Sequence, residues 1–160
     1  MRRLQLAAIL SLGLAPAAVA ADGVVSVERG ALVAVMGGCH DCHTNGYNES
    51  NGKIDPAVAL KGKSVGFMGP WGTTYPLNLR LTAVEKATNE DEFVLFLQKF
   101  ETRPPMPWYN VHAMPESDLR SLYQYIKSLG EPGEQAPEAV APGEMPKTPY
   151  IVFAPPTMPK

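Results

Sequence analysis

Three stretches of the chain repeat their apolar residues at helical spacing. In the first of them the apolar positions lie four residues apart, at Val27, Ala31 and Val35. Ser26, a residue type that favours the helix N-cap, precedes this stretch, and Gly37 and Gly38 follow it. Because glycine commonly ends helices, the pattern predicts a helix over residues 27–35 that stops just before Cys39.

The second and third stretches predict two further helices. One follows a weak capping box at Thr88 and Asp91 and has four apolar residues on a single face, Phe93, Phe96, Leu97 and Phe100. The other has Pro115 in its first turn, acidic residues near the positive end of its dipole, and Gly130 and Pro132 at its end. Its apolar positions follow the helical period most closely: Leu119, Leu122, Tyr123, Ile126 and Leu129.

Two segments show little sustained periodicity. Residues 44–87 are rich in Asn, Gly, Lys and Pro, so we expect loops there. Residues 131–160 carry eight prolines, which favours an extended, polyproline-like tail. For this tail two alternatives stay open: a disordered terminus, or an arm that docks on the protein or on a partner through the four consecutive apolar residues at 150–153.

The N-terminus has the layout of a secretory signal peptide. Arg2 and Arg3 precede an apolar stretch at 4–14, and the small residues 17–20 end in an Ala-x-Ala pattern that predicts cleavage after Ala20. A retained N-terminal anchor is the alternative. No later segment approaches the roughly 20 consecutive apolar residues that a membrane-spanning helix needs, so we expect an exported, periplasmic protein.

Length and charge restrict the organisation further. A chain of 160 residues fits one globular domain, and we expect a signal peptide at 1–20, a domain at 21–130 and the Pro-rich tail at 131–160. Without Arg2 and Arg3 the formal net charge changes from −2 to −4. A mildly acidic chain with no concentrated basic face is not typical of nucleic-acid binding.

The two cysteines belong to a short motif, Cys39-x-x-Cys42-His43. Two thiols at this spacing can add to the two vinyl groups of a haem, and the next residue's imidazole can bind the iron from below. The alternatives are a thioredoxin-like redox pair, a zinc half-site and a structural disulfide. The sequence favours one covalent haem c, because no βαβ alternation and no second Cys pair accompany the motif.

Four segments in this order resemble the monohaem class I cytochromes c, in particular the cytochrome c subunits of bacterial periplasmic dehydrogenases. They are Gly-Gly-Cys-His-Asp-Cys-His-Thr at 37–44, Gly-Pro-Trp-Gly-Thr-Thr-Tyr-Pro-Leu-Asn-Leu at 69–79, Pro-Pro-Met-Pro-Trp at 104–108, and the last apolar stretch at 118–129. The resemblance implies an all-α fold with three main helices and loops wrapped around the haem. It also implies that the first and last helices cross and pack.

The resemblance further implies that a methionine binds the iron opposite His43. Met106 lies in a proline-stiffened run that matches the family's ligand loop, so we expect His43 and Met106 to be the two iron ligands. Met114, beside the last predicted helix, and Met68 are the next alternatives.

Two further histidines need an interpretation. His112 is an alternative second ligand, because imidazole also binds iron, although an exposed or supporting role is expected for it. His40 lies inside the attachment motif, and we expect it to point away from the iron and to lie at the surface.

The remaining expectations concern the pocket and the function. Four aromatic or polar residues in the matching segments are expected to pack on the haem or to bind a propionate: Trp71, Tyr75, Asn78 and Trp108. With both axial positions filled, the iron would pass electrons by outer-sphere transfer and would not act as an enzyme site. We therefore expect an exported electron carrier whose redox partner is a periplasmic dehydrogenase or oxidase.

Two alternatives to a free carrier stay open. One is a dedicated electron-transfer subunit of a periplasmic dehydrogenase, with the Pro-rich tail as its interaction arm. The other is a five-coordinate haem sensor or enzyme.

Overall fold

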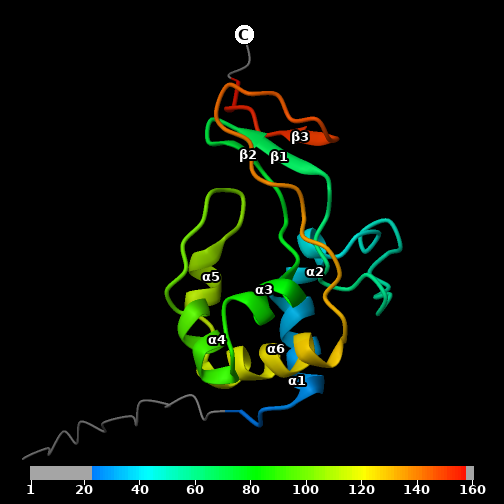
Figure 1. Ribbon diagram of the computed structural model, residues 1–160, viewed down its shortest axis with the longest axis vertical. Helices are drawn as coiled ribbons and strands as arrows, with labels where there is room; N and C mark the ends of the chain where they lie inside the picture. The colour runs from blue at the N-terminus through cyan, green and yellow to red at the C-terminus, as the bar shows by residue number, and fades with distance from the viewer. Residues whose placement is uncertain (1–22, 158–160) are drawn as a thin grey trace, which may run out of the picture.

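The computed structural model describes residues 23–157, and the predicted signal peptide at 1–20 lies outside them. Figure 1 shows a small sheet at one end of the molecule and most of the helices at the other. Within these residues the chain forms, in order, α1 (Val27–Met36), α2 (Cys39–His43), β1 (Gly66–Gly69), β2 (Gly72–Thr74), α3 (Leu79–Glu85), α4 (Glu90–Leu97), α5 (Trp108–His112), α6 (Glu116–Ser128) and β3 (Tyr150–Val152). Among them, no helix has the length and apolar character needed to cross a membrane.

The prediction of an all-α chain with the class I cytochrome c fold is wrong. The structure is mixed α/β, because β2, β1 and β3 form a three-stranded sheet, and the class I cytochrome c fold is not what it shows. The strands have only three or four residues, and glycines at 66, 69 and 72 leave no alternation of apolar and polar side chains. Strands of this kind give no periodic signal, so residues 44–87 were expected to be loops throughout.

The three predicted helices are present as α1, α4 and α6. Ser26 caps α1 as expected, since its hydroxyl accepts a hydrogen bond from the Arg29 N–H at 3.1 Å. The start of α4 is one residue later than predicted: Asn89 is the N-cap, and the Glu92 carboxylate reaches back to the N–H of Thr88 at 2.8 Å.

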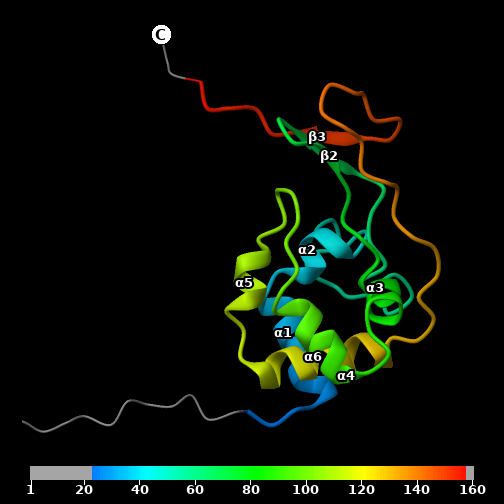
Figure 2. The same cartoon turned by 60° about the vertical axis from the view of Figure 1, so that its left-hand side comes forward.

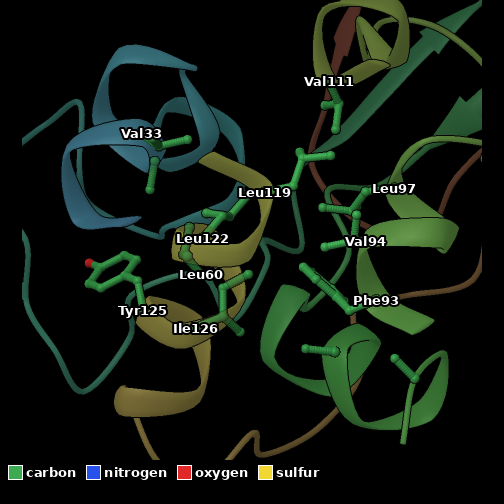
Figure 3. Close-up of a cluster of buried hydrophobic side chains, with 13 residues drawn as sticks. Val33, Leu60, Phe93, Val94, Leu97, Val111, Leu119, Leu122, Tyr125 and Ile126 are labelled. Atoms are coloured by element: carbon green, nitrogen blue, oxygen red, sulfur yellow. The ribbon is translucent and has the colours of Figure 1, made fainter. Parts of the chain in front are cut away.

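The core lies where α1 and α4 pack on α6 (Figure 3). The expected contact between the first and last helices is therefore present. It is unusually close at Gly30, where a Cβ would lie 1.9 Å from the Ser121 carbonyl oxygen. The most deeply buried apolar side chains of this core include Ala34, Leu60, Phe93, Leu119 and Ile126.

The sheet joins the middle of the chain to its C-terminal tail. Antiparallel pairing places Met68 of β1 opposite Thr73 of β2, and parallel pairing places it beside Val152 of β3. Figure 2 shows the tail leaving the end of α6 and running along the side of the molecule to this sheet. The tail is therefore an arm docked on its own protein, although Ile151, Val152 and Phe153 remain 52%, 56% and 42% exposed.

Candidate haem-attachment site

Helix α2 presents the whole Cys39-x-x-Cys42-His43 motif within five residues. Gly38, which separates it from α1, has φ +70°, a left-handed conformation that glycine adopts without strain. Both cysteines are half-buried free thiols, so no disulfide joins them. The turn at Gly38 thus folds the two thiols and the imidazole into one short helical segment.

The ring of His43 is buried and is held by a hydrogen bond to the backbone. Its Nδ1 lies 2.7 Å from the carbonyl oxygen of Leu77. A carbonyl oxygen only accepts, so the proton lies on Nδ1 and Nε2 keeps its lone pair. Burial also lowers the pKa of His43, which favours the neutral ring. A neutral imidazole whose other nitrogen donates to a backbone carbonyl is the usual state of a metal-binding histidine.

Burial has the opposite effect on the thiols. It raises the pKa of Cys39 to about 11, and it raises the pKa of Cys42 as well. Cysteines of redox Cys-x-x-Cys pairs typically have lowered pKa values, because a nearby positive charge or helix N-terminus stabilises the thiolate. Burial therefore favours the neutral thiol at both positions.

The prediction that His40 lies at the surface is wrong. Its side chain is 1% exposed, with Nδ1 2.7 Å from the Thr44 hydroxyl and Nε2 3.3 Å from the Tyr125 hydroxyl. The Thr44 oxygen also accepts the Leu60 N–H at 2.8 Å. Because Tyr125 belongs to α6, His40 links α2 to the core of the protein.

Met106 lies in the loop between α4 and α5, and it packs against the same core cluster as Cys39. Met114 packs there too, with its methyl carbon 2.9 Å from the position a Cβ on Gly37 would take. Met68 instead lies on β1 and lines a cavity of about 400 Å³ between the sheet and the C-terminal arm. Among the described residues, Met106 and Met114 are thus the methionines that pack against the same core cluster as Cys39 of α2.

Asn78 and Tyr75, two of the four expected pocket residues, form hydrogen bonds to the tail. Asn78 is buried, caps α3 through Leu81 N–H, and donates to the carbonyls of Pro132 at 2.7 Å and Glu134 at 2.9 Å. These bonds use its oxygen and both its N–H groups. The Tyr75 hydroxyl lies 2.7 Å from that of Thr148.

The two tryptophans differ in their surroundings. Trp71 packs on Phe153, with ring centroids 6.0 Å apart, and its buried Nε1 has no hydrogen-bond partner among residues 23–157. Trp108 begins α5 and packs on His112 at 5.0 Å. The His112 Nε2 donates to the Phe100 carbonyl at 2.9 Å, which ties α5 to the loop after α4.

Sequence reasoning missed two participants. Nothing singled out Leu77, because its role uses only a backbone carbonyl. Arg80 is buried and donates to the carbonyls of Ala59 at 2.7 Å and Leu129 at 2.6 Å. A single arginine in a segment expected to be a loop does not indicate that its side chain will bind backbone carbonyls of two distant segments.

The donor set fits a covalently attached haem. The motif offers two free thiols and a neutral imidazole with Nε2 available, which are the groups that attach a haem c and bind its iron. Residues 23–157 contain no group of three or more His, Cys, Asp or Glu side chains placed to hold a metal ion. No family model, curated protein or solved structure matches this chain.

Proposed function

We propose that this chain is an exported c-type haem protein that carries single electrons between partner proteins. The observation that carries the proposal most directly is the hydrogen bond from His43 Nδ1 to the Leu77 carbonyl at 2.7 Å. It fixes the tautomer and directs Nε2 away from the backbone, in the state that iron ligation requires.

Each residue of the site has a separate task. Cys39 and Cys42 would form thioether bonds, which prevent loss of the cofactor, and His43 would supply the proximal nitrogen. Met106 would supply a thioether sulfur on the other side, which favours ferrous iron and raises the reduction potential. The haem itself supplies reversible one-electron chemistry. With His43 and Met106 both bound to the iron, the group would exchange electrons without an open position for a substrate.

The Met106 assignment is tested by replacing it in the full-length, haem-loaded protein. We expect Met106→Ala to abolish the sulfur-to-iron charge-transfer absorption of the ferric state and to lower the reduction potential, because the polarisable sulfur ligand is lost. Met145→Ala is the control, since Met145 is 65% exposed in the tail. An absorption spectrum and potential unchanged in Met106→Ala would exclude Met106 as the ligand.

Carbon monoxide distinguishes a carrier from a five-coordinate haem sensor or enzyme. A six-coordinate ferrous site should bind the gas slowly, because a protein ligand must leave first, and Met106→Ala should bind it quickly. Rapid binding to the unaltered protein, measured by stopped-flow absorption, would contradict the carrier function.

A further inference from the structure

We propose that the C-terminal arm, residues 140–154, positions the loop that holds Met106, and that Phe153 is its main positioning residue. The inference rests on the proposed function, since it takes Met106 as the iron ligand. The tail would then help to hold the Met106 sulfur in place. The contacts run from the arm to the β1–β2 hairpin, and from the hairpin to the loop that holds Met106.

The arm is bound along both edges of the hairpin. Beside β1, the Gly66 N–H donates to the Pro149 carbonyl and the Phe153 N–H donates to the Met68 carbonyl, each at 2.8 Å. Beside β2, Thr73 and Val140 exchange two backbone hydrogen bonds of 3.0 and 2.9 Å. A Cβ on Gly72 would lie 2.3 Å from the Val140 carbonyl oxygen, so only glycine permits this approach. The hairpin is thus enclosed by the arm.

Phe153 holds the turn of the hairpin. Phe67 pairs with Ile151, and Phe153 lies two residues further along the arm, so its side chain is on the same face as Phe67. The ring centroids of Phe153 and Phe67 are 5.8 Å apart, and those of Phe153 and Trp71 are 6.0 Å apart. The Trp71 ring in turn covers Gly69, where a Cβ would lie 2.6 Å from ring atoms. Trp71 is therefore held between Gly69 and Phe153.

The hairpin in turn holds the Met106 loop. Arg103 donates from Nη1 to the Trp71 carbonyl at 3.0 Å, and the Thr74 hydroxyl donates to the Pro104 carbonyl at 2.8 Å. These bonds fix the two residues that lie three and two positions before Met106. Because a ligand bond requires the sulfur to stay within a fraction of an ångström of one place, a shift of the hairpin would weaken ligation.

The test compares two neighbouring residues of the arm, Val152 at the end of β3 and Phe153 just after it, whose side chains point to opposite faces. Phe153→Ala removes the aromatic contacts, and because Phe153 is 42% exposed the change opens no enclosed cavity. Val152→Ala is the matched control, since Val152 pairs with Met68 on the other face and is 56% exposed. Phe153→Tyr keeps the ring and should restore the wild-type behaviour.

The measured quantity is the rate at which cyanide displaces the sulfur ligand in the full-length ferric protein. Loss of the ring contacts of Phe153 should accelerate displacement about fivefold. Val152→Ala and Phe153→Tyr should stay within about twofold of the wild type, as expected where no positioning contact is lost. Thr74→Val, which removes the donor to Pro104, should accelerate displacement as well, and the double variant should fall short of the product of the two effects.

The outcomes separate two kinds of failure. If Met106→Ala accelerates cyanide binding while Phe153→Ala and Thr74→Val do not, the arm has no positioning role and the carrier function stands. If Val152→Ala accelerates it as much as Phe153→Ala, the effect is general destabilisation and the proposal is overturned. If Met106→Ala binds cyanide at the wild-type rate, Met106 is not the ligand, and the inference falls together with that part of the proposed function.

Discussion

Gly30 determines how closely α1 approaches α6. A Cβ at this position would lie 1.9 Å from the Ser121 carbonyl oxygen and 2.7 Å from the Tyr125 Cβ. Neither neighbour can yield easily, because one is backbone and the other begins a buried side chain. Tyr125 also contacts His40 of α2, so the spacing of α1 and α6 here affects α2 as well as the core.

Gly30→Ala should therefore lower the free energy of unfolding by about 3 kcal/mol or more, because the helices must separate to admit the methyl group. Gly23→Ala is the control, since a Cβ there meets only the Ser117 hydroxyl at 3.9 Å. Chemical denaturation of both variants checks this. A Gly30→Ala protein as stable as Gly23→Ala would show that α1 and α6 are not packed as described.

At the residue scale the sequence was informative wherever the chemistry is local. The spacing of Cys39, Cys42 and His43 is visible in the motif, and Ser26 is recognisable as a cap because it bonds three residues away. His40 was misjudged because its partner, Tyr125, is 85 residues away. A contact at that separation depends on how the helices pack, which a local pattern does not encode.

At the scale of elements, helix α2 is joined to α6 by the buried contact between His40 and Tyr125. The Tyr125 hydroxyl lies 3.3 Å from His40 Nε2, and the His40 Nδ1 is 2.7 Å from the Thr44 hydroxyl. The imidazole is thus held from both sides, which keeps α2 in one orientation relative to the core.

Tyr125→Phe should lower the free energy of unfolding by about 1–2 kcal/mol, because the buried His40 nitrogen loses its partner. Tyr123→Phe is the matched control on the same helix, since Tyr123 is half-buried and contacts Phe93 through its ring at 5.2 Å. Thermal unfolding followed by circular dichroism compares the two. Equal effects of the two substitutions would contradict a structural role for the His40 contact.

Helices and strands could be predicted from the sequence where their apolar residues repeat regularly over many positions. Helix α6 repeats its apolar residues over 13 positions and was recognised at once, whereas the three-residue β2 was not. The third strand could not be placed, because β3 pairs in parallel with a segment more than 80 residues earlier. Its four consecutive apolar residues, 150–153, left open whether the tail is disordered or docks as an arm, and they did not show what an arm would dock against.

At the scale of the whole molecule, the tail completes the fold. At the start of the tail, Arg80 donates to the Leu129 and Glu131 carbonyls. Asn78 donates to the carbonyls of Pro132 and Glu134, and the arm then pairs with both edges of the hairpin. The all-α expectation failed because it assigned residues 131–160 to a separate tail and residues 44–87 to loops packed on a cofactor. In the structure these two segments contact each other and build the sheet.

A chain that ends at Ala139 should lose at least about 2 kcal/mol of stability, because the hairpin becomes an isolated two-stranded ribbon and its outward backbone groups lose their partners. A chain that ends at Pro156 keeps β3 and is the control. Hydrogen exchange of the amides in β1 and β2 checks the result directly. Equal protection in both truncated chains would show that the arm does not support the sheet.

The most direct measurement is the mass of the intact chain after denaturation. The full-length gene is expressed with a haem-attachment system, the protein is unfolded in acid, and its mass is compared with that of a Cys39→Ser, Cys42→Ser double variant. We predict that the wild type retains the mass of one haem and that the double variant has the mass of the polypeptide alone, because thioether bonds survive unfolding. A wild-type chain with the mass of the bare polypeptide would contradict covalent haem attachment at this motif.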